Sequence, residues 1–294
     1  MTPLRLGTLV SVAMLAFAGN SLLCRLALKH TTIDAATFTT LRLASGACML
    51  WLVVQWQRRA RTVAHAAEPP QRSLAGNWPS ALALFVYATS FSFAYISMSA
   101  ASGALLLFGS VQVSMIGYGI YRGERMQAIQ VIGLALALAG LVALMLPGLA
   151  TPDLPASLSM LLAGAAWGVY SLRGRAMQKP DAGGPTAVTA GNFIRTVPMT
   201  LALSLLMVNQ MSLDVHGILF AIASGALASG IGYAIWYQTL PALASTQAAT
   251  VQLSVPVIAA LGGVVLLNEA LTLPMVLASG AILGGIALVI LKRK

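Results

Sequence analysis

The stretch that decides the fold is Ala244–Leu291, which reads ASTQAATVQLSVPVIAALGGVVLLNEALTLPMVLASGAILGGIALVIL. It consists of two apolar runs, each about 20 residues long and able to cross a bilayer as a helix. A short polar turn at Asn268-Glu269 joins them. The stretch therefore predicts two consecutive membrane-spanning helices near the end of the chain.

A weaker copy of this stretch lies at Ala101–Leu146, reading ASGALLLFGSVQVSMIGYGIYRGERMQAIQVIGLALALAGLVALML. Both begin with Ala-Ser and run through apolar residues to a glutamate. From Glu124 and Glu269 onward one offset of 145 residues fits both copies, and before the glutamates the register slips by two. A repeat of this period in an apolar chain indicates a duplicated membrane unit.

The composition sets the class of protein. The chain has 294 residues, of which 58% are hydrophobic and only 8% are charged. Soluble domains carry about 25% charged residues. Inside lipid every backbone amide needs a partner within its own segment, so the apolar runs are helices. We therefore expect an all-α membrane fold.

The net charge of +10 does not indicate nucleic-acid binding, because the basic residues lie between apolar runs and not on one face. Cys24 and Cys48 lie at depths that differ by roughly 10 Å at 1.5 Å per residue. A disulfide between them is therefore not expected, and both are interpreted as small core residues.

The apolar runs predict ten transmembrane helices, five in each half. Those of the first half are 6–28, 35–57, 78–98, 101–121 and 128–146, and those of the second are 157–177, 187–208, 216–238, 244–267 and 272–291. The proline-punctuated stretch 147–155 separates two repeats, 1–150 and 151–294. The start also resembles a signal peptide, with Arg5 before an apolar run and Ala16-Phe17-Ala18 as a cleavage-like site. The apolar run continues past that site, which favours a span.

Lysine and arginine set the orientation. Thirteen of the 17 basic residues fall on the side of the N-terminus, two fall on the other side and two lie inside spans. By the positive-inside rule both termini are cytoplasmic. Five spans per half is an odd number, so the halves insert with opposite topology, as in the inverted repeats of many secondary transporters.

Two deep arginines, Arg42 and Arg195, occupy the second span of each half. A buried arginine in a membrane usually faces a polar interior, so Arg42 is a candidate for a substrate carboxylate or a gating contact. The alternative is that both arginines bind helix-end carbonyls and fix the packing, or extend to the membrane surface.

No span centre carries a carboxylate or an imidazole, since all acidic residues and histidines fall in loops or at span ends. Proton-coupled carriers generally need such groups, so we expect transport without a dedicated mid-membrane proton site. The sequence also lacks a metal-ligand cluster, a phosphate-binding glycine loop and a Ser or Cys with a histidine at similar depth. We expect no metal, no cofactor and no enzymatic activity.

Mid-membrane amides, aromatic rings and one proline remain as candidates for a transport site. The predicted substrate-binding residues are Asn20, Tyr87, Phe91, Tyr95, Gln112, Trp167, Tyr237 and Gln252, with Pro256 predicted as a kink beside Arg42 and Arg195 as structural or gating residues. A cavity lined by rings and a few amides suits an aromatic or amphipathic solute. Tyr95 and Tyr237 also fit interfacial anchors. Gly280-x-x-x-Gly284 is typical of close helix packing, within the chain or with a second copy.

These motifs, in this order, resemble the bacterial ten-span members of the drug/metabolite transporter superfamily with two EamA-type halves. The resemblance is carried by Ala18-Gly19-Asn20, Trp167-Gly168, Leu41-Arg42, Ile194-Arg195 and Ser254-Val255-Pro256 followed by Glu269, and in detail it is greatest to exporters of aromatic amino acids. It implies a central cavity formed by spans one, three, four, six, eight and nine. Span four lacks the proline of span nine, so the halves are not expected to move alike.

The sequence thus predicts an inner-membrane exporter of amino acids, aromatic ones favoured, and of similar small metabolites. It would work by alternating access, as a monomer or homodimer whose partners are its small-molecule substrate and the lipid bilayer. The alternative is a membrane-embedded enzyme acting on a lipid-linked substrate. A channel is disfavoured, because no ring of charges or carbonyl filter is seen.

Overall fold

The computed structural model describes residues 1–64, 75–98, 100–145, 153–176, 184–267 and 273–291, and these residues contain helices and no strands. Every predicted span has a helical counterpart. The helices of the first half are α1 (Pro3–His30), α2 (Ala35–Ala64), α3 (Trp78–Ser97), α4 (Ala100–Tyr121) and α5 (Ala128–Met145). The break at 147–155 and the turn at Glu269 fall wholly or partly outside the described residues.

The second half contains two interrupted spans. Its regular helices are α6 (Leu154–Ala176), α7 (Pro185–Leu206) and α12 (Leu273–Leu291). The eighth span comprises α8 (Val215–Ala223), the π-helix η4 (Ser224–Ile231) and α9 (Gly232–Thr239), and the ninth comprises α10 (Ser245–Val251) and α11 (Ser254–Leu267). Short 3₁₀ turns follow α7 (η3, Val208–Gln210) and α9 (η5, Leu240–Ala242).

The helices have the length and surface of membrane spans. Four segments are long and apolar enough to cross a bilayer, namely Pro3–His30, Ala35–Arg59, Trp78–Ser97 and Val215–Ala242, and shorter apolar helices accompany them. Large apolar side chains cover the outer faces, among them Leu206 and Leu219, which are 83% and 58% exposed. A surface this apolar fits lipid and not water.

Polar residues at the span ends begin helices. Asp34 precedes α2 and accepts the amide of Thr37 at 2.9 Å, and Asp214 caps α8 through the amide of Gly217 at 2.8 Å. Asp34 also accepts the Ser212 amide of the second half at 2.9 Å. Partial burial pushes the pKa of Asp34 upward, but these amide hydrogen bonds outweigh it and hold the pKa below its ordinary value.

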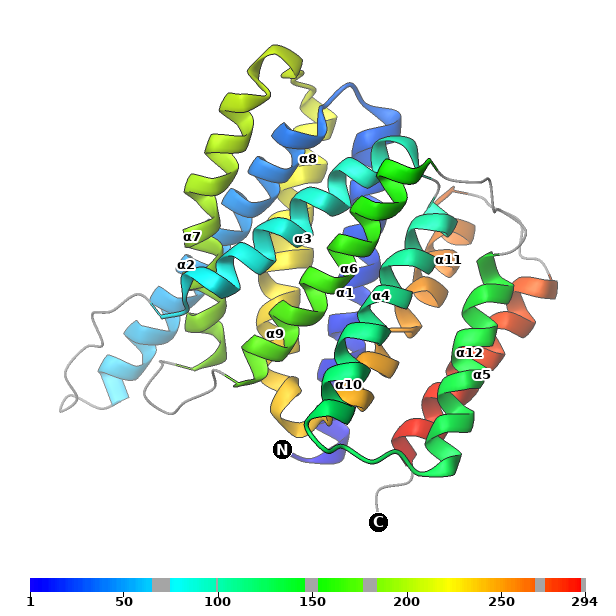
Figure 1. The fold of residues 1–294 in the computed structure, drawn as a ribbon. Helices are drawn as coiled ribbons and strands as arrows, with labels where there is room; N and C mark the ends of the chain where they lie inside the picture. The colour runs from blue at the N-terminus through cyan, green and yellow to red at the C-terminus, as the bar shows by residue number, and fades with distance from the viewer. Residues whose placement is uncertain (65–74, 99, 146–152, 177–183, 268–272, 292–294) are drawn as a thin grey trace.

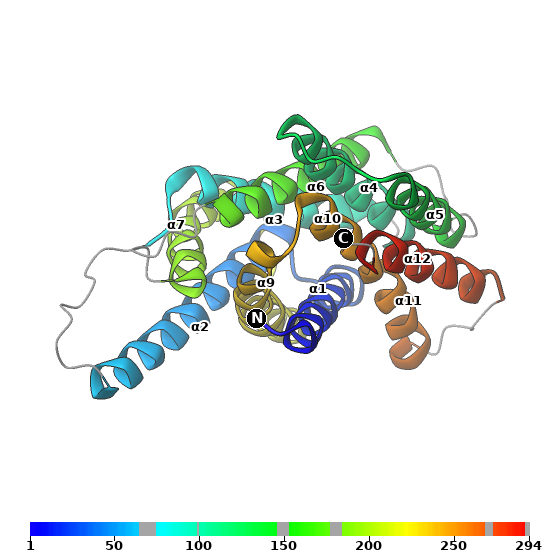
Figure 2. The same ribbon diagram turned by 90° about the horizontal axis from the view of Figure 1, so that it is seen from below.

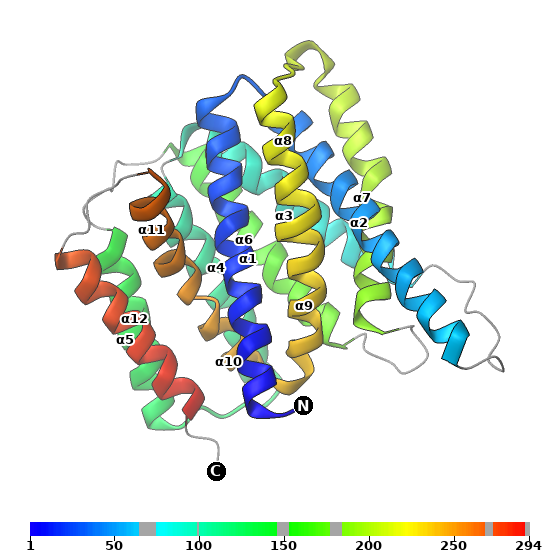
Figure 3. The ribbon, with the colours of Figure 1, turned by 180° about the vertical axis from the view of Figure 1, so that it is seen from behind.

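Helices from the two halves interleave. Helix α2 packs against α7, α4 against α10, and α5 against α12, while α1 packs against α8, η4 and α9 and α3 packs against α6. Figure 2 shows the α5–α12 pair on one flank and the α2–α7 pair on the other. Figure 3 shows α1 beside the α8–α9 span. Helix α1 begins and α12 ends at the same end of the bundle (Figure 1).

Two sequence expectations need correction. Gly280 and Gly284 face open space, because a Cβ added to either would have no neighbouring atom within 4 Å, so they do not mediate packing within the described part of the chain, and packing against a second copy stays a prediction. Gly133 and Gly285 do this instead, since each would place a Cβ against the other's carbonyl oxygen. Cys48 is not a core residue but is exposed on α2, whereas Cys24 is buried, and both cysteines are free.

Candidate functional site

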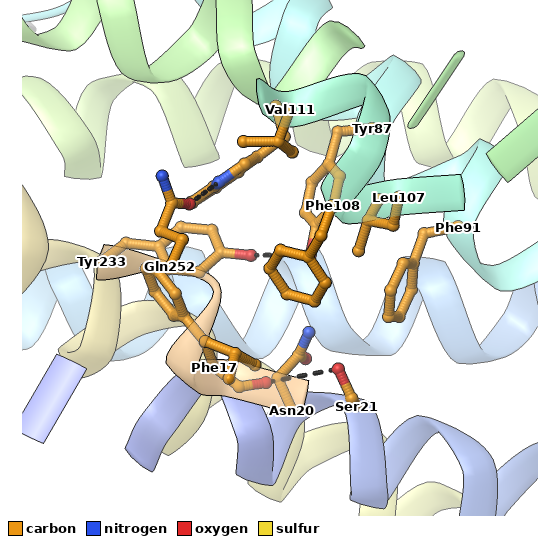
Figure 4. Close-up of a pocket in the computed structure, with 12 residues that line it drawn as sticks. Phe17, Asn20, Ser21, Tyr87, Phe91, Leu107, Phe108, Val111, Tyr233 and Gln252 are labelled. Atoms are coloured by element: carbon orange, nitrogen blue, oxygen red, sulfur yellow. Dashed lines mark hydrogen bonds between the residues drawn. The ribbon is translucent and has the colours of Figure 1, made fainter. Parts of the chain in front are cut away.

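A cavity lies between the two halves of the chain, and Figure 4 shows it in close-up. Its empty volume is about 360 Å³, which is an upper limit for a solute because it includes space open to the outside. The lining residues are Phe17, Asn20, Ser21, Tyr87, Phe91, Leu107, Phe108, Val111, Trp167, Tyr233, Gln252 and Val255. They come from spans one, three, four, six, eight and nine, as the family resemblance implies.

Aromatic rings form most of the cavity wall around Trp167. Its ring centroid lies 4.8 Å from that of Tyr233, 5.0 Å from Tyr87 and 5.3 Å from Phe17. These separations fall in the range at which aromatic pairs attract beyond simple burial. Rings from four separate helices therefore share one surface.

Small residues let α6 bring this tryptophan to the cavity. A Cβ on Gly168 would lie 2.7 Å from the Cβ of Ser114, and one on Gly164 would meet the carbonyl oxygen of Leu107. Helix α6 therefore lies directly against α4. In the sequence pair Trp167-Gly168, the tryptophan therefore supplies a ring of the cavity wall and the glycine permits the close packing of α6 against α4.

The break in the ninth span positions Gln252. The amide of Leu253 bonds the Thr250 carbonyl at 3.0 Å, and that of Val255 bonds the Gln252 carbonyl at 3.0 Å, so the chain tightens into 3₁₀ turns there. Pro256 follows and has no amide to continue the α-helical ladder. The Gln252 Oε1 atom accepts the Trp167 indole N–H at 2.6 Å. Span four has no such break, which agrees with its lack of a proline.

A polar chain links three helices beside the cavity. Arg42 Nε donates to the Ser229 hydroxyl at 3.1 Å, and that hydroxyl contacts Asn20 Oδ1 at 3.4 Å. Ser224 donates to the same Asn20 oxygen at 2.6 Å. Both serines belong to the π-helix η4, a conformation that is rare and frequent at functional sites. The π-helix thus places the hydroxyls of Ser224 and Ser229 against α1, and the Ser229 hydroxyl also contacts α2.

Arg42 is fully buried behind the aromatic wall. Its Nη2 atom donates to the hydroxyls of Tyr233 at 3.0 Å and Tyr87 at 3.4 Å, and its guanidinium carbon lies 5.6 Å from the ring centre of Phe91. Nη1 has no hydrogen-bond partner among the residues that the structure describes. The arginine thus lies against three cavity-lining rings without itself lining the cavity.

Arg195 has a different environment. Its Nη1 donates to the backbone carbonyls of Ala75 at 2.6 Å and Gly191 at 2.9 Å. Gly191 is needed there, because a Cβ would overlap the Ala75 carbonyl. Arg195 therefore fastens the chain that leads into α3 to helix α7. This is the carbonyl-binding alternative raised from the sequence, and it holds for Arg195 and not for Arg42.

Three of the predicted substrate-binding residues lie outside the cavity wall. Tyr95 packs on Phe91 at 4.8 Å, and Tyr237 packs on Tyr170 at 5.2 Å, both in the buried interior and not at an exposed interface. Gln112 donates to the Ala249 carbonyl at 2.8 Å and so joins α4 to α10. Asn20, Tyr87, Phe91, Trp167 and Gln252 do line the cavity.

Several wall residues escape prediction from the sequence, chiefly Phe17 and Tyr233. Phe17 lies one turn before Asn20 on α1, so its placement on the same face is readable once Asn20 is chosen. Tyr233 shares a helix face with Trp236 and Tyr237, but nothing in that pattern separates the ring at the cavity from those packed beside it. Leu107 and Val111 carry no signal that distinguishes them from lipid-facing residues.

Glu124 lies between α4 and α5 and connects the two halves of the chain. Its two carboxylate oxygens accept the backbone amides of Ser245 at 2.9 Å and Thr246 at 3.2 Å. These are the first amides of α10, which no helical carbonyl can satisfy. The described residues contain no group of three His, Cys, Asp or Glu side chains that would hold a metal ion.

These features define a multi-pass helical membrane protein with a central aromatic cavity. Residues 154–291 match the EamA-like transporter family. An uncharacterized protein of Pseudomonas aeruginosa, PA1977, is 51% identical over 97% of this chain and 94% of its own length. A solved structure, titled only as the crystal structure of a protein, has a TM-score of 0.79 at 21% identity and covers 99% of this chain and 98% of that one.

The second half of the chain, residues 154–291, thus contains an EamA-like transporter family domain. This match and the apolar helices indicate a multi-pass membrane protein, and the matched family is one of small-molecule transporters. The solved structure, at 21% identity, supports the fold alone.

Proposed function

We propose that this protein exports amino acids, aromatic ones favoured, and similar small metabolites across the bacterial inner membrane. The observation that carries the proposal is the cavity wall, where the rings of Phe17, Tyr87, Trp167 and Tyr233 surround a space bordered by the amide of Asn20. Rings supply apolar and stacking contacts for an aromatic side chain, and polar groups orient it. The proposed transport unit is one chain, because one chain supplies the whole wall.

Alternating access between two inverted repeats, residues 1–150 and 151–294, is the proposed mechanism. Its support is the pattern of helix contacts. Suppose that each span of the first half changes places with the span five positions later. The contact between α1 and α11 then becomes the contact between α6 and α4, and the contact between α2 and η4 becomes the contact between α7 and α3. All four contacts are present in the structure. A two-fold relation between the halves has this consequence. With the basic residues on one side, the proposed orientation has both termini in the cytoplasm.

The proposal is tested by flux of labelled phenylalanine from proteoliposomes with no imposed ion gradient. We expect flux above that of empty liposomes, competition by tryptophan, and at least a tenfold loss in Trp167→Ala, which removes the ring at the centre of the wall. Leu219→Ala, on the outer surface, is the matched control and should retain flux. Absence of flux with or without a proton gradient would refute the proposal.

The membrane-embedded enzyme remains the rival function. It would need a reactive group at membrane depth, for which the sequence offers no candidate. Turnover of a lipid-linked substrate by the purified protein, abolished by a cavity substitution, would place the enzyme ahead of the transporter.

A further inference from the structure

Arg42 carries a positive charge with no acidic partner in the described structure. Only seven Asp and Glu residues occur in the chain. The four that are described, Asp34, Glu124, Asp153 and Asp214, all lie between helices, whereas Arg42 is 0% exposed within α2. The hydrogen bonds of Arg42 go to neutral hydroxyls, and its Nη1 has none. An unneutralised charge at this depth is costly, and an anionic ligand in the adjacent cavity would offset that cost.

The charged Arg42 side chain also determines which group of the Asn20 amide is left to face the cavity. Because Arg42 Nε donates to the Ser229 hydroxyl, the proton of that hydroxyl is directed away, toward Asn20 Oδ1 at 3.4 Å. Ser224 approaches the same oxygen at 2.6 Å. The Asn20 oxygen therefore accepts its hydrogen bonds from the two serines of η4. Its NH₂ group, a donor only, is the end left for a ligand in the cavity that Asn20 lines (Figure 4).

The hydroxyl pair of Tyr87 and Tyr233, like the amide of Asn20, presents a hydrogen-bond donor to the cavity. A hydroxyl has one proton and two acceptor positions. Arg42 Nη2 donates to both Tyr87 and Tyr233, whose oxygens are 3.3 Å apart. Tyr233 donates its proton to Tyr87 in the bond between them, so it is the Tyr87 proton that has no acceptor in that pair. A neighbouring cation strengthens such a hydroxyl as a donor. Both tyrosines line the cavity.

We propose that this donor surface binds the carboxylate of the transported solute. Asn20 and Tyr87 would donate to the carboxylate oxygens, Tyr233 would hold the Tyr87 hydroxyl through its own proton, and Arg42 would act as a positioning residue that sets their polarity from behind the wall. The inference rests on the proposed function and narrows it. The solute must carry an aromatic or apolar body and a carboxylate, the amine is dispensable, and aromatic cations that lack a carboxylate are excluded.

The test compares two competitors of phenylalanine flux in proteoliposomes. 3-Phenylpropionate has the carboxylate without the amine, and 2-phenylethylamine has the amine without the carboxylate. We expect half-inhibition by 3-phenylpropionate at a concentration at least tenfold lower. Equal inhibition, or a preference for the amine while phenylalanine is transported, would overturn the inference and leave the proposed function standing.

Substitutions in this hydrogen-bond network test whether it causes the preference for the carboxylate over the amine. Tyr233→Phe keeps the ring and should reduce the carboxylate preference several-fold. Asn20→Asp replaces the donor with an anion and should reverse the preference toward 2-phenylethylamine. Tyr118→Phe, on a partly exposed ring of α4 outside the cavity, is the matched control and should leave it unchanged. Arg42→Met should abolish the preference and Arg42→Lys should retain part of it. If every network variant keeps the wild-type ratio, the inference is wrong.

Binding keeps the inference testable where flux is absent or a variant is poorly folded. Quenching of tryptophan fluorescence by 3-phenylpropionate in purified wild-type and Tyr233→Phe protein measures affinity directly. Tighter binding of the acid than of the amine, weakened in the variant, supports the carboxylate site even if export fails. Indifference to the charge of the ligand contradicts it.

Discussion

The hydrogen bond between Trp167 and Gln252 offers a test of how the broken ninth span is held in place. Trp167→Phe keeps an aromatic ring but removes the indole donor, which now contacts Gln252 Oε1 at 2.6 Å. The amide is not free to turn toward another partner, because its Nε2 donates to the Ala248 carbonyl at 2.9 Å. Hydrogen bonds between membrane helices contribute about 0.6 kcal/mol on average and at most about 1.7 kcal/mol. The short distance and full burial place this bond near the upper value.

A double-mutant cycle isolates that bond from the loss of ring atoms. The free energy of unfolding is measured by denaturant titration in mixed micelles, followed by circular dichroism, for Trp167→Phe, Gln252→Leu and the double variant. We expect a coupling energy of about 1–1.7 kcal/mol. Pairing Trp167→Phe with Gln112→Leu, whose amide bonds the Ala249 carbonyl instead, should give additive effects. A coupling below about 0.4 kcal/mol for the first pair would refute the reasoning.

Three further predictions concern contacts between the halves. Glu124→Gln removes the charge from the start of α10 and should lower the free energy of unfolding by about 1 kcal/mol in the same titration, with the alanine variant losing more. The Asp34 carboxylate stabilises the fold above its ordinary pKa of 3.8, and this stabilisation is lost as pH falls through its lower folded value. Asp34→Asn should therefore flatten the acid side of a stability–pH curve, whereas an unchanged curve would contradict the Ser212 contact. Gly225→Ala, which would press a Cβ against the Arg42 carbonyl, should destabilise by about 1–3 kcal/mol or more, and a neutral effect would show that α2 and η4 can separate freely.

The positions of the helices can be predicted because membrane spans are recognisable by their length and apolar composition. Even the interrupted eighth span, 216–238, is predicted as one crossing, and the structure places α8, η4 and α9 there. Its π-helical segment has no comparable signal, since serine, glycine and alanine fit an α-helix equally well in Ser224–Ile231. The break near Gln252 is indicated by Pro256, because proline removes a backbone donor.

The cavity wall is only partly predictable, for a physical reason. Helices in lipid are apolar on every side, so periodicity does not reveal which face turns inward. Asn20 and Gln252 can be chosen because an amide avoids lipid, and Trp167 because it lies far from the interface. Phe17 is compatible with lipid and with the wall alike. The spacing of Tyr87, Phe91 and Tyr95 on α3 predicts that all three line the cavity. The cavity wall ends at Phe91. The spacing therefore identifies the correct face of α3 but overestimates how much of that face lines the cavity.

Arg42 and Arg195 have different surroundings in the two halves of the chain. Both lie in the second span of their half, and a duplicated scaffold would place them in similar surroundings. Arg195 bonds backbone carbonyls, which any sequence supplies, so it stabilises the scaffold. Arg42 bonds the side-chain hydroxyls of Ser229, Tyr87 and Tyr233, so its contacts depend on the identity of those three residues. Exchanging each arginine for lysine should separate these roles: Arg195→Lys should lower stability and leave competitor preference unchanged, whereas Arg42→Lys should change the preference between acid and amine. If both variants alter stability alone, the charge of Arg42 has no part in choosing the solute.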